Sequence, residues 1–201
     1  HARRQVDAGV DLIVAQGTEA GGHTGQVSTM VLVPEVVRAV SPLPVLAAGG
    51  IVTGAQVAAA MALGAQGVWC GSVWLTTAEA ETDPVVKQKM LGASSSDTVR
   101  SRSLTGKPAR MLRTAWTDEW EAEQAPSPLP MPLQTMLVAT AQQRIARDAR
   151  TPGSGAEQLA TYFVGQGVGL MDQIRPARQV VEEMVAGYLE VAERFAAQIE
   201  G

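Results

Sequence analysis

Three short apolar runs in the first part of the chain have the pattern of buried parallel strands. They are "DLIVAQG" at residues 11–17, "LPVLAAGG" at residues 43–50 and "QGVWCGS" at residues 66–72. Because the runs are continuously apolar rather than alternating, each strand is expected to be covered on both faces. Each run ends in glycine or a small polar residue, which is typical of a strand followed by a turn.

Helical patterns separate these strands. "TMVLVPEVVRAV" at residues 29–40 predicts a helix that Pro34 keeps short, and "TGAQVAAAMALGA" at residues 53–65 predicts a helix that stops near Gly64. Strand, glycine turn and helix therefore repeat, as in the βα units of a parallel sheet. The opening "ARRQVDAG" has the pattern of the end of an amphipathic helix that leads into the first strand.

The pattern changes after Thr77. Further helices are expected from about Asp83–Pro84, over residues 133–149, and from about Pro176 onward. The stretch at 94–114 is polar and basic and predicts a loop or short strands, while the proline-rich stretch at 121–134 predicts a linker or an extended crossing segment. The last helix has an apolar face that could pack on a lid or on a partner, and we favour the lid. This face carries Val180, Met184, Tyr188, Val191 and Phe195.

Composition and charge exclude several classes of protein. The chain is 46% hydrophobic and 18% charged, so it can bury a sizeable core and is not disordered by composition. A net charge of -4 argues against partners such as nucleic acid or a membrane surface. No apolar run approaches the roughly 18 residues that a membrane span needs. The single cysteine, Cys70, excludes an internal disulfide, favours a cytoplasmic location and is expected to be a small core residue.

Glycine turns follow the second and third predicted strands. Gly49 and Gly50 end one run, and Gly71 with Ser72 ends the next. Glycine lets the backbone approach a ligand closely, and the N–H groups at a following helix start can bind an anion. Parallel strands with such turns fit a doubly wound sheet or a (β/α)8 barrel, whose last two loops commonly bind phosphate. The two turns together predict one phosphate site, whereas either alone could be a tight turn.

His23 is the only histidine inside the chain, and it lies in the glycine-rich stretch "AQGTEAGGHTG" at residues 15–25. The glycines remove side chains that would block a flat ligand, so the imidazole is expected to project over a site. An imidazole with its ordinary pKa of about 6.5 suits a general base near neutral pH. Glu19 could cap a helix, bind a backbone amide or orient its neighbours. With so few histidines and cysteines, no metal site is expected.

The motifs together resemble the nitronate monooxygenase family, formerly called 2-nitropropane dioxygenase, which includes flavin-dependent enoyl-acyl-carrier-protein reductases. The resemblance rests on "GTEAGGHTG", "VLVPEVV", "PVLAAGGIVTG", "AAAMALGAQGVWCGSVW" and "TGKPAR", and more loosely on "GQGVGL". It implies a (β/α)8 barrel with FMN at its mouth and a small helical lid. A barrel takes about 250 residues, so the chain is expected to hold about strands six to eight, and another segment or chain to supply the N-terminal strands.

The resemblance also implies a division of the chain and a set of site residues. Residues 1–80 would be the barrel part, 81–165 a loop-rich helical lid segment, and 166–201 a C-terminal helical segment packing on barrel or lid. His23 would be the catalytic base. The residues implied to lie close to the flavin or to bind its phosphate are Gly21, Gly22, Ala48, Gly49, Gly50, Gly71 and Ser72. Trp69 departs from the glutamine or methionine common in the family, which affects the pocket shape.

The activity implied first is the FMN-dependent oxidation of alkyl nitronates with O2 to a carbonyl compound and nitrite. A second possibility is an NAD(P)H-linked flavin reductase or dehydrogenase acting on an enoyl- or acyl-thioester of coenzyme A or acyl carrier protein. The basic stretch favours it if the stretch binds cosubstrate phosphates, although a solvated surface loop is the preferred interpretation. The cations are Arg100, Arg102, Lys107, Arg110 and Arg113. A third possibility is a non-catalytic flavin-binding subunit.

Overall fold

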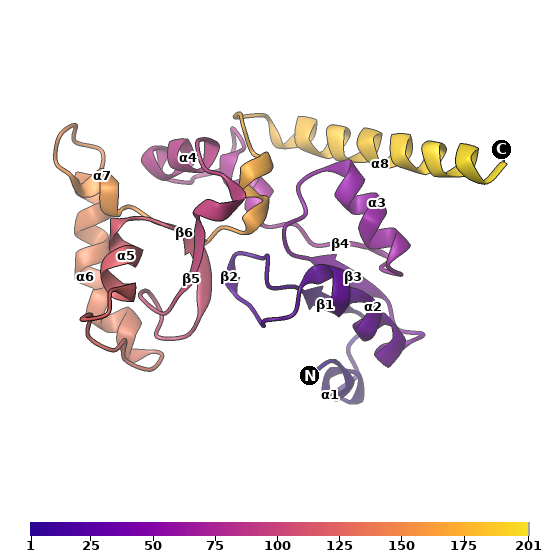
Figure 1. The fold of residues 1–201 in the computed structure, drawn as a ribbon, viewed down its shortest axis with the longest axis horizontal. Coiled ribbons are helices and arrows are strands. Elements are labelled where there is room, and N and C mark those ends of the chain that lie inside the picture. Colours follow the sequence, from indigo (N-terminus) through magenta and orange to yellow (C-terminus); the bar gives the residue numbers. More distant parts are fainter. Residues whose placement is uncertain (201) are drawn as a thin grey trace.

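A computed structural model describes residues 1–200 and shows two sheets that lie side by side (Figure 1). The parallel sheet has the strand order β1–β3–β4, and its strands are β1 (Ile13–Gln16), β3 (Val45–Ala48) and β4 (Gly67–Val68). The antiparallel sheet has the order β2–β6–β5, and its strands are β2 (Gly22–His23), β5 (Thr98–Ser101) and β6 (Ala109–Leu112). The predicted α/β class is confirmed.

The parallel sheet contains the three predicted strands in shortened form. Ile13 of β1 pairs with Val45 of β3, and Leu46 pairs with Gly67 of β4. The third strand was predicted too long: it ends at Val68, and Cys70 beyond it is half-buried and packs against the margin of the core. Within residues 1–200, β1 and β4 each pair with one neighbour, so the three strands do not close into a barrel.

Helices α2 (Thr29–Val40) and α3 (Gly54–Ala62) follow β1 and β3, as predicted. The expectation that Pro34 shortens the first helix was wrong. A proline removes one helical hydrogen bond, but α2 continues past it because Val33 and Val40 are buried in the core on either side. Helix α3 begins with a capping box, in which the Thr53 hydroxyl accepts from the Gln56 amide.

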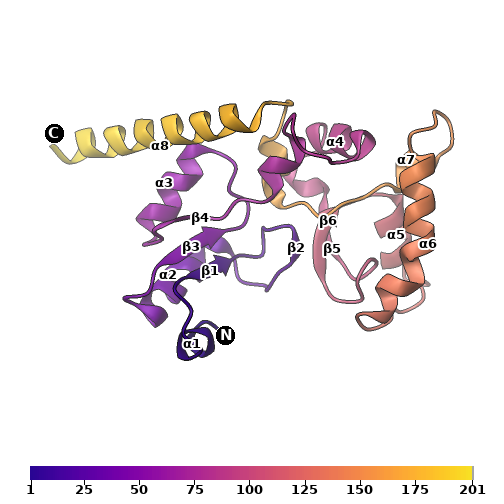
Figure 2. The same cartoon turned by 180° about the vertical axis from the view of Figure 1, so that it is seen from behind.

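The long C-terminal helix α8 (Ala177–Glu200) lies against the start of α3, which descends from it at an angle in both views (Figures 1 and 2). The two helices cross at glycines: a Cβ atom on Gly54 would lie 2.4 Å from the backbone of Met184 and of Tyr188. Val180, Met184 and Val191 are buried on this side of α8. The apolar face of the last helix therefore packs on α3, within residues 1–80, and the expectation that it packs on the lid segment was wrong.

The segment between the parallel sheet and α8 was expected to be loop-rich and helical, but it also contains β5 and β6. These strands form where the sequence left open a loop or short strands. Ser101 in β5 and Ser103 just after it are polar but buried, which conceals the strand pattern. The helices of this segment are α4 (Pro84–Leu91), α5 (Ala115–Glu121), α6 (Leu133–Asp148) and α7 (Ala156–Leu159). Short 3-10 turns are η1 (Ser72–Thr76), η2 (Ser95–Asp97) and η3 (Gln166–Leu170).

Candidate functional site

A cavity of about 480 Å³ lies at the carboxyl ends of the parallel strands. Residues at or just after the ends of β1, β3 and β4 line it, together with Phe163 and Gly167 from the segment before α8. Seven of the eight residues singled out from the sequence are brought together here: Gly21, Gly22, Ala48, Gly49, Gly50, Gly71 and Ser72. The eighth, His23, is not a lining residue, but it follows Gly22 directly.

Because glycine has no side chain, the glycines that line this cavity leave their backbone accessible from it. Gly49 (φ +116°) and Gly50 (φ +71°) adopt conformations that a residue with a Cβ atom rarely takes. A Cβ atom on Gly49 would also lie 2.8 Å from the Thr29 hydroxyl. By contrast, a Cβ atom on Gly22 or Gly71 would meet nothing within 4 Å, so those two glycines border open space.

The segment before α8 closes one side of the cavity, and sequence analysis did not identify its role. The Gly165 amide donates to the Ser72 hydroxyl at 2.8 Å, so that hydroxyl keeps its own proton free to donate. A Cβ atom on Gly167 would lie 2.8 Å from the Gly50 carbonyl oxygen. The density of glycine in "GQGVGL" was the available signal, because it marks a close approach of backbone to backbone.

Glu19 performs two of the roles that were left open. Its carboxylate accepts from the Thr29 amide at 2.9 Å and 3.1 Å, and from the Thr29 hydroxyl at 2.9 Å, at the start of α2. It therefore caps the helix by binding a backbone amide. The Glu19 carbonyl also accepts from the Gln166 amide at 2.8 Å. Glu19 thus links the loop after β1 to α2 and to the segment before α8.

His23 belongs to the two-residue strand β2 and pairs with Ala109 of β6. Its imidazole is exposed to solvent, and its Nε2 atom lies 2.8 Å from the Thr105 hydroxyl in the loop between β5 and β6. The antiparallel sheet therefore holds His23, although the segment that leads to it follows β1 of the parallel sheet. Sequence analysis could not identify Thr105, because it lies 82 residues away.

Two arginines of the basic stretch hold the chain around His23, at residues 18–24, which we call the His23 loop. Arg110 donates to the Thr18 carbonyl at 2.8 Å, and Arg100, its cross-strand neighbour, donates to the Thr24 carbonyl at 3.0 Å. Burial lowers the pKa of Arg110, and the nearby charge of Arg100 lowers it further. The solvated-loop interpretation holds for the exposed Lys107 and Arg113, but it was wrong for the buried Arg110.

The loop after β4 contributes Trp69 and Cys70 to the cavity. The Trp69 side chain is largely exposed, and burial raises the pKa of the Cys70 thiol. In the described part of the chain, no three histidine, cysteine or acidic residues lie close enough to hold a metal ion. Among residues 1–200, no helix has the length and apolar character required to cross a membrane.

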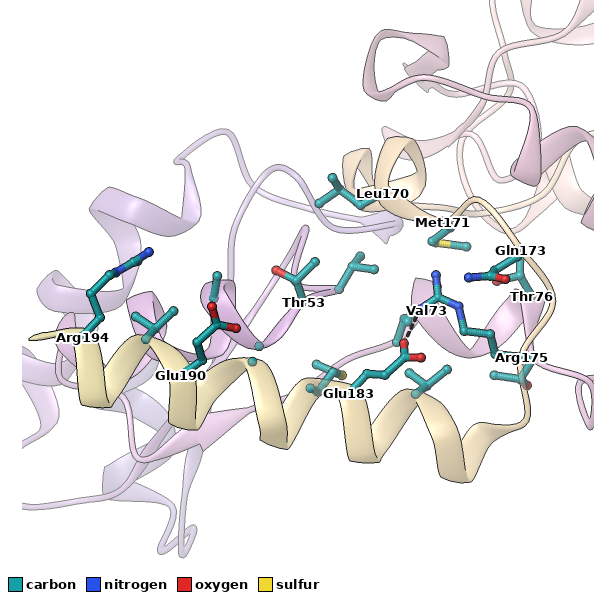
Figure 3. A pocket seen from close by; sticks show the side chains of 18 residues that line it. Thr53, Val73, Thr76, Leu170, Met171, Gln173, Arg175, Glu183, Glu190 and Arg194 are labelled. Carbon is teal, nitrogen blue, oxygen red and sulfur yellow. Dashed lines mark hydrogen bonds and ion pairs between the residues drawn. The ribbon is translucent and has the colours of Figure 1, made fainter.

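A second cavity, of about 420 Å³, lies between α3, α8 and the segment at residues 170–175 (Figure 3). None of the predicted site residues lines it. Arg175 reaches across it to pair with Glu183 of α8, and it also pairs with Asp172 at 2.7 Å. Arg175 and Glu183 thus attach the start of α8.

Comparison with known proteins identifies relatives over nearly the whole chain. The family model described as nitronate monooxygenase matches residues 1–187. The Mycobacterium tuberculosis protein named "Putative monooxygenase Rv1533" is 71% identical over 190 residues, which are 94% of this chain and 51% of that protein. FabK from Thermotoga maritima is 38% identical with a TM-score of 0.79, covering 98% of this chain and 60% of that one. A nitroalkane oxidase from Streptomyces ansochromogenes is 30% identical with a TM-score of 0.83, covering 96% and 56%.

The chain spans about half the length of the curated relatives it matches. The family model, however, covers the parallel sheet, the antiparallel sheet and the first part of α8. The resemblance predicted from the glycine and histidine motifs is therefore confirmed, and the chain belongs to the nitronate monooxygenase family.

Proposed function

We propose that this chain is part of an FMN-dependent oxidoreductase that converts alkyl nitronates and O2 to a carbonyl compound and nitrite. The observation that carries the proposal is the glycine-lined cavity with His23 one residue outside it. Membership of the nitronate monooxygenase family supports the reaction class. The similarity to a nitroalkane oxidase supports nitro compounds as the substrate class.

The cavity has the features that FMN requires. Its volume is within the range of about 300–1,000 Å³ that is usual for ligand pockets. None of its lining residues carries a charge, so the phosphate would meet no carboxylate there. The backbone of Gly49, Gly50 and Gly71 and the hydroxyl of Ser72 would hold the phosphate, and Gly21 and Gly22 would lie against the ring system.

The residues of this chain would bind, orient and deprotonate the substrate. His23 would remove the proton from the carbon that bears the nitro group and so form the nitronate within the site. Arg100 and Arg110 would keep the His23 loop in place through the Thr24 and Thr18 carbonyls. Trp69, which is largely exposed at the cavity, would limit the shape of the substrate. The chemistry that FMN supplies when bound is electron transfer between the nitronate and O2.

The test is anaerobic mixing of the intact, flavin-loaded protein with an alkyl nitronate while the flavin absorbance is followed. Rapid loss of the oxidised flavin spectrum is expected, and an unchanged spectrum would contradict nitronate oxidation. In the His23→Ala variant, turnover of neutral nitroalkanes should fall by about 10²–10⁴-fold, which is the usual contribution of a general base. Turnover of preformed nitronates should fall far less, because no proton must be removed.

The second candidate is NAD(P)H-linked reduction or dehydrogenation of an enoyl- or acyl-thioester. The observation that favours it is the pair of exposed cations Arg102 and Lys107, on the same loop as the partner of His23. Arg110 is unsuitable as a probe, because it is buried and holds the His23 loop. If the candidate is right, Lys107→Ala should raise the KM for NADPH or for the thioester and leave nitronate oxidation unchanged.

The third candidate, a non-catalytic flavin-binding subunit, predicts that His23→Ala changes no measured activity. In each case we propose that further strands, from the same or another chain, complete a (β/α)8 barrel. The free edges of β1 and β4 in the described part of the chain support this, since unpaired edges tend to acquire partners. The proposed location is the cytoplasm, where a reducing environment suits the free thiol of Cys70.

A further inference from the structure

The hydrogen bonds around Thr105 determine which nitrogen of His23 carries the proton. The Thr105 hydroxyl oxygen lies 2.8 Å from His23 Nε2 and 2.9 Å from the Lys107 carbonyl oxygen. It also accepts from the Lys107 amide at 3.3 Å. A threonine hydroxyl has a single proton to donate, so it can serve either the imidazole or the carbonyl, and not both.

The carbonyl oxygen of Lys107 can only accept. If the hydroxyl proton pointed at His23, two oxygen acceptors would face each other at 2.9 Å with no proton between them. If the proton points at the carbonyl, the hydroxyl oxygen is free to accept from Nε2–H, and every close contact is a hydrogen bond. The second arrangement is therefore the stable one.

We propose that Thr105 fixes His23 in the Nε2–H tautomer and so leaves Nδ1 as the nitrogen that takes the substrate proton. Thr105 is a positioning residue, because it acts through His23. The identity of the proton acceptor rests on the proposed function, whereas the tautomer rests on the hydrogen bonds alone. In the reaction, the C–H bond of the nitroalkane breaks, its electron pair moves to the nitro group, and the proton is bound by Nδ1.

The contact with Thr105 is unchanged by this transfer. An imidazolium donates from both nitrogens, so Nε2–H continues to donate to the Thr105 hydroxyl after Nδ1 has been protonated. No group has to rotate during the step. The arrangement corresponds to the orienting role of the carboxylate in a serine protease triad, but it uses a neutral hydroxyl.

The loop that carries Thr105 is held from several sides. The Gly106 amide donates to the Arg102 carbonyl at 2.8 Å. From α6, the Gln134 side chain donates to the Ser103 carbonyl at 2.8 Å, and the Thr135 hydroxyl donates to the Leu104 carbonyl at 3.2 Å. These contacts fix the hydroxyl in position, and β2–β6 pairing fixes the backbone of His23.

The test is a long-range ¹H–¹⁵N correlation spectrum of the histidine rings in the intact protein, recorded at alkaline pH where imidazoles are neutral. The His23→Gln variant identifies the His23 signals by difference. We expect Nδ1 to resonate as the unprotonated, pyridine-type nitrogen and Nε2 as the protonated one. The reverse pattern would overturn the proposal without any variant of Thr105 having to fold.

Two variants then separate tautomer control from simple structural support. Thr105→Ser keeps the hydroxyl and should keep the ring signals, whereas Thr105→Val removes the acceptor and should shift both nitrogens towards a tautomer mixture. Unchanged signals in Thr105→Val would overturn the role of Thr105. Nitroalkane turnover should fall about tenfold in Thr105→Val and be restored in Thr105→Ser. If the spectrum shows the Nε2–H tautomer but the protein oxidises no nitronate, this inference is supported and the proposed function is contradicted.

Discussion

The two sheets of this molecule contribute to the candidate site in different ways. The parallel sheet contributes backbone groups, because the loops after its strands are glycine-rich and no charged side chain lines the cavity there. The antiparallel sheet offers side chains: β6 holds the backbone of His23, and the loop between β5 and β6 supplies the Thr105 hydroxyl. Under the proposed function, cofactor binding and control of the proton acceptor would therefore fall to different sheets.

The difference also concerns how each part is held in place. At the parallel sheet, close contacts with both side-chain and backbone atoms leave room for hydrogen alone at Gly49 and Gly167. At the antiparallel sheet, arginine side chains connect strands to the His23 loop over distances of 76 and 92 residues along the chain. Substitutions that add a single carbon should therefore be most harmful at the first sheet, and substitutions that change hydrogen-bond geometry should be most harmful at the second.

The largest effect is expected for Gly49→Ala. The positive φ angle and the Cβ atom placed 2.8 Å from the Thr29 hydroxyl should together lower the free energy of unfolding by about 3–4 kcal/mol. Gly9→Ala is the matched control, because Gly9 (φ +83°) has the same kind of angle but no atom within 4 Å of an added Cβ. It should lose only about 1–2 kcal/mol. If urea unfolding shows the same loss of unfolding free energy in both variants, the close contact at Gly49 is unimportant.

The sequence was sufficient to predict most of the parallel sheet and to single out residues that line its cavity. Continuous apolar runs located β1 and β3, and paired glycines located the loops that line the cavity. Both signals are local, since they depend on the backbone and on nearest neighbours along the chain. Three later helices, α4 with its Asp83 cap, α6 and α8, were also recognisable from local signals.

The antiparallel sheet could not be predicted in the same way. Strand β2 has only two residues, and its pairing partner is found almost ninety residues later. Ser101, Ser103 and Arg110 are polar yet buried, because their partners come from remote segments or from the turn itself. The basic stretch therefore has the composition of a surface loop although part of it lies inside the molecule.

An intermediate effect is expected for Arg110→Lys. A lysine cannot donate from one planar group to both the Thr18 carbonyl and the Thr98 hydroxyl, as Arg110 does. Loss of these charge-assisted bonds should cost about 1–3 kcal/mol of unfolding free energy. Arg113→Lys is the control, because that side chain is exposed and pairs only with Asp118, and it should unfold like the parent protein. If both variants lose the same stability, Arg110 does not hold the His23 loop.

The smallest effect concerns the reactivity of Cys70, and it tests whether the parallel-sheet cavity is the place that a cofactor fills. Because burial raises the pKa of this thiol, less thiolate is present at neutral pH than in a free cysteine. Alkylation should therefore be slow at pH 7, by about tenfold for each unit of pKa, and should accelerate only at more alkaline pH. Mass spectrometry of the intact protein with iodoacetamide measures this rate.

Since Cys70 lines the cavity, FMN should slow the reaction further. Protection by FMN at Cys70 that disappears in Gly71→Ala, where the added methyl enters open space, would connect the cavity to the cofactor directly. Equal alkylation with and without FMN would place the cofactor elsewhere.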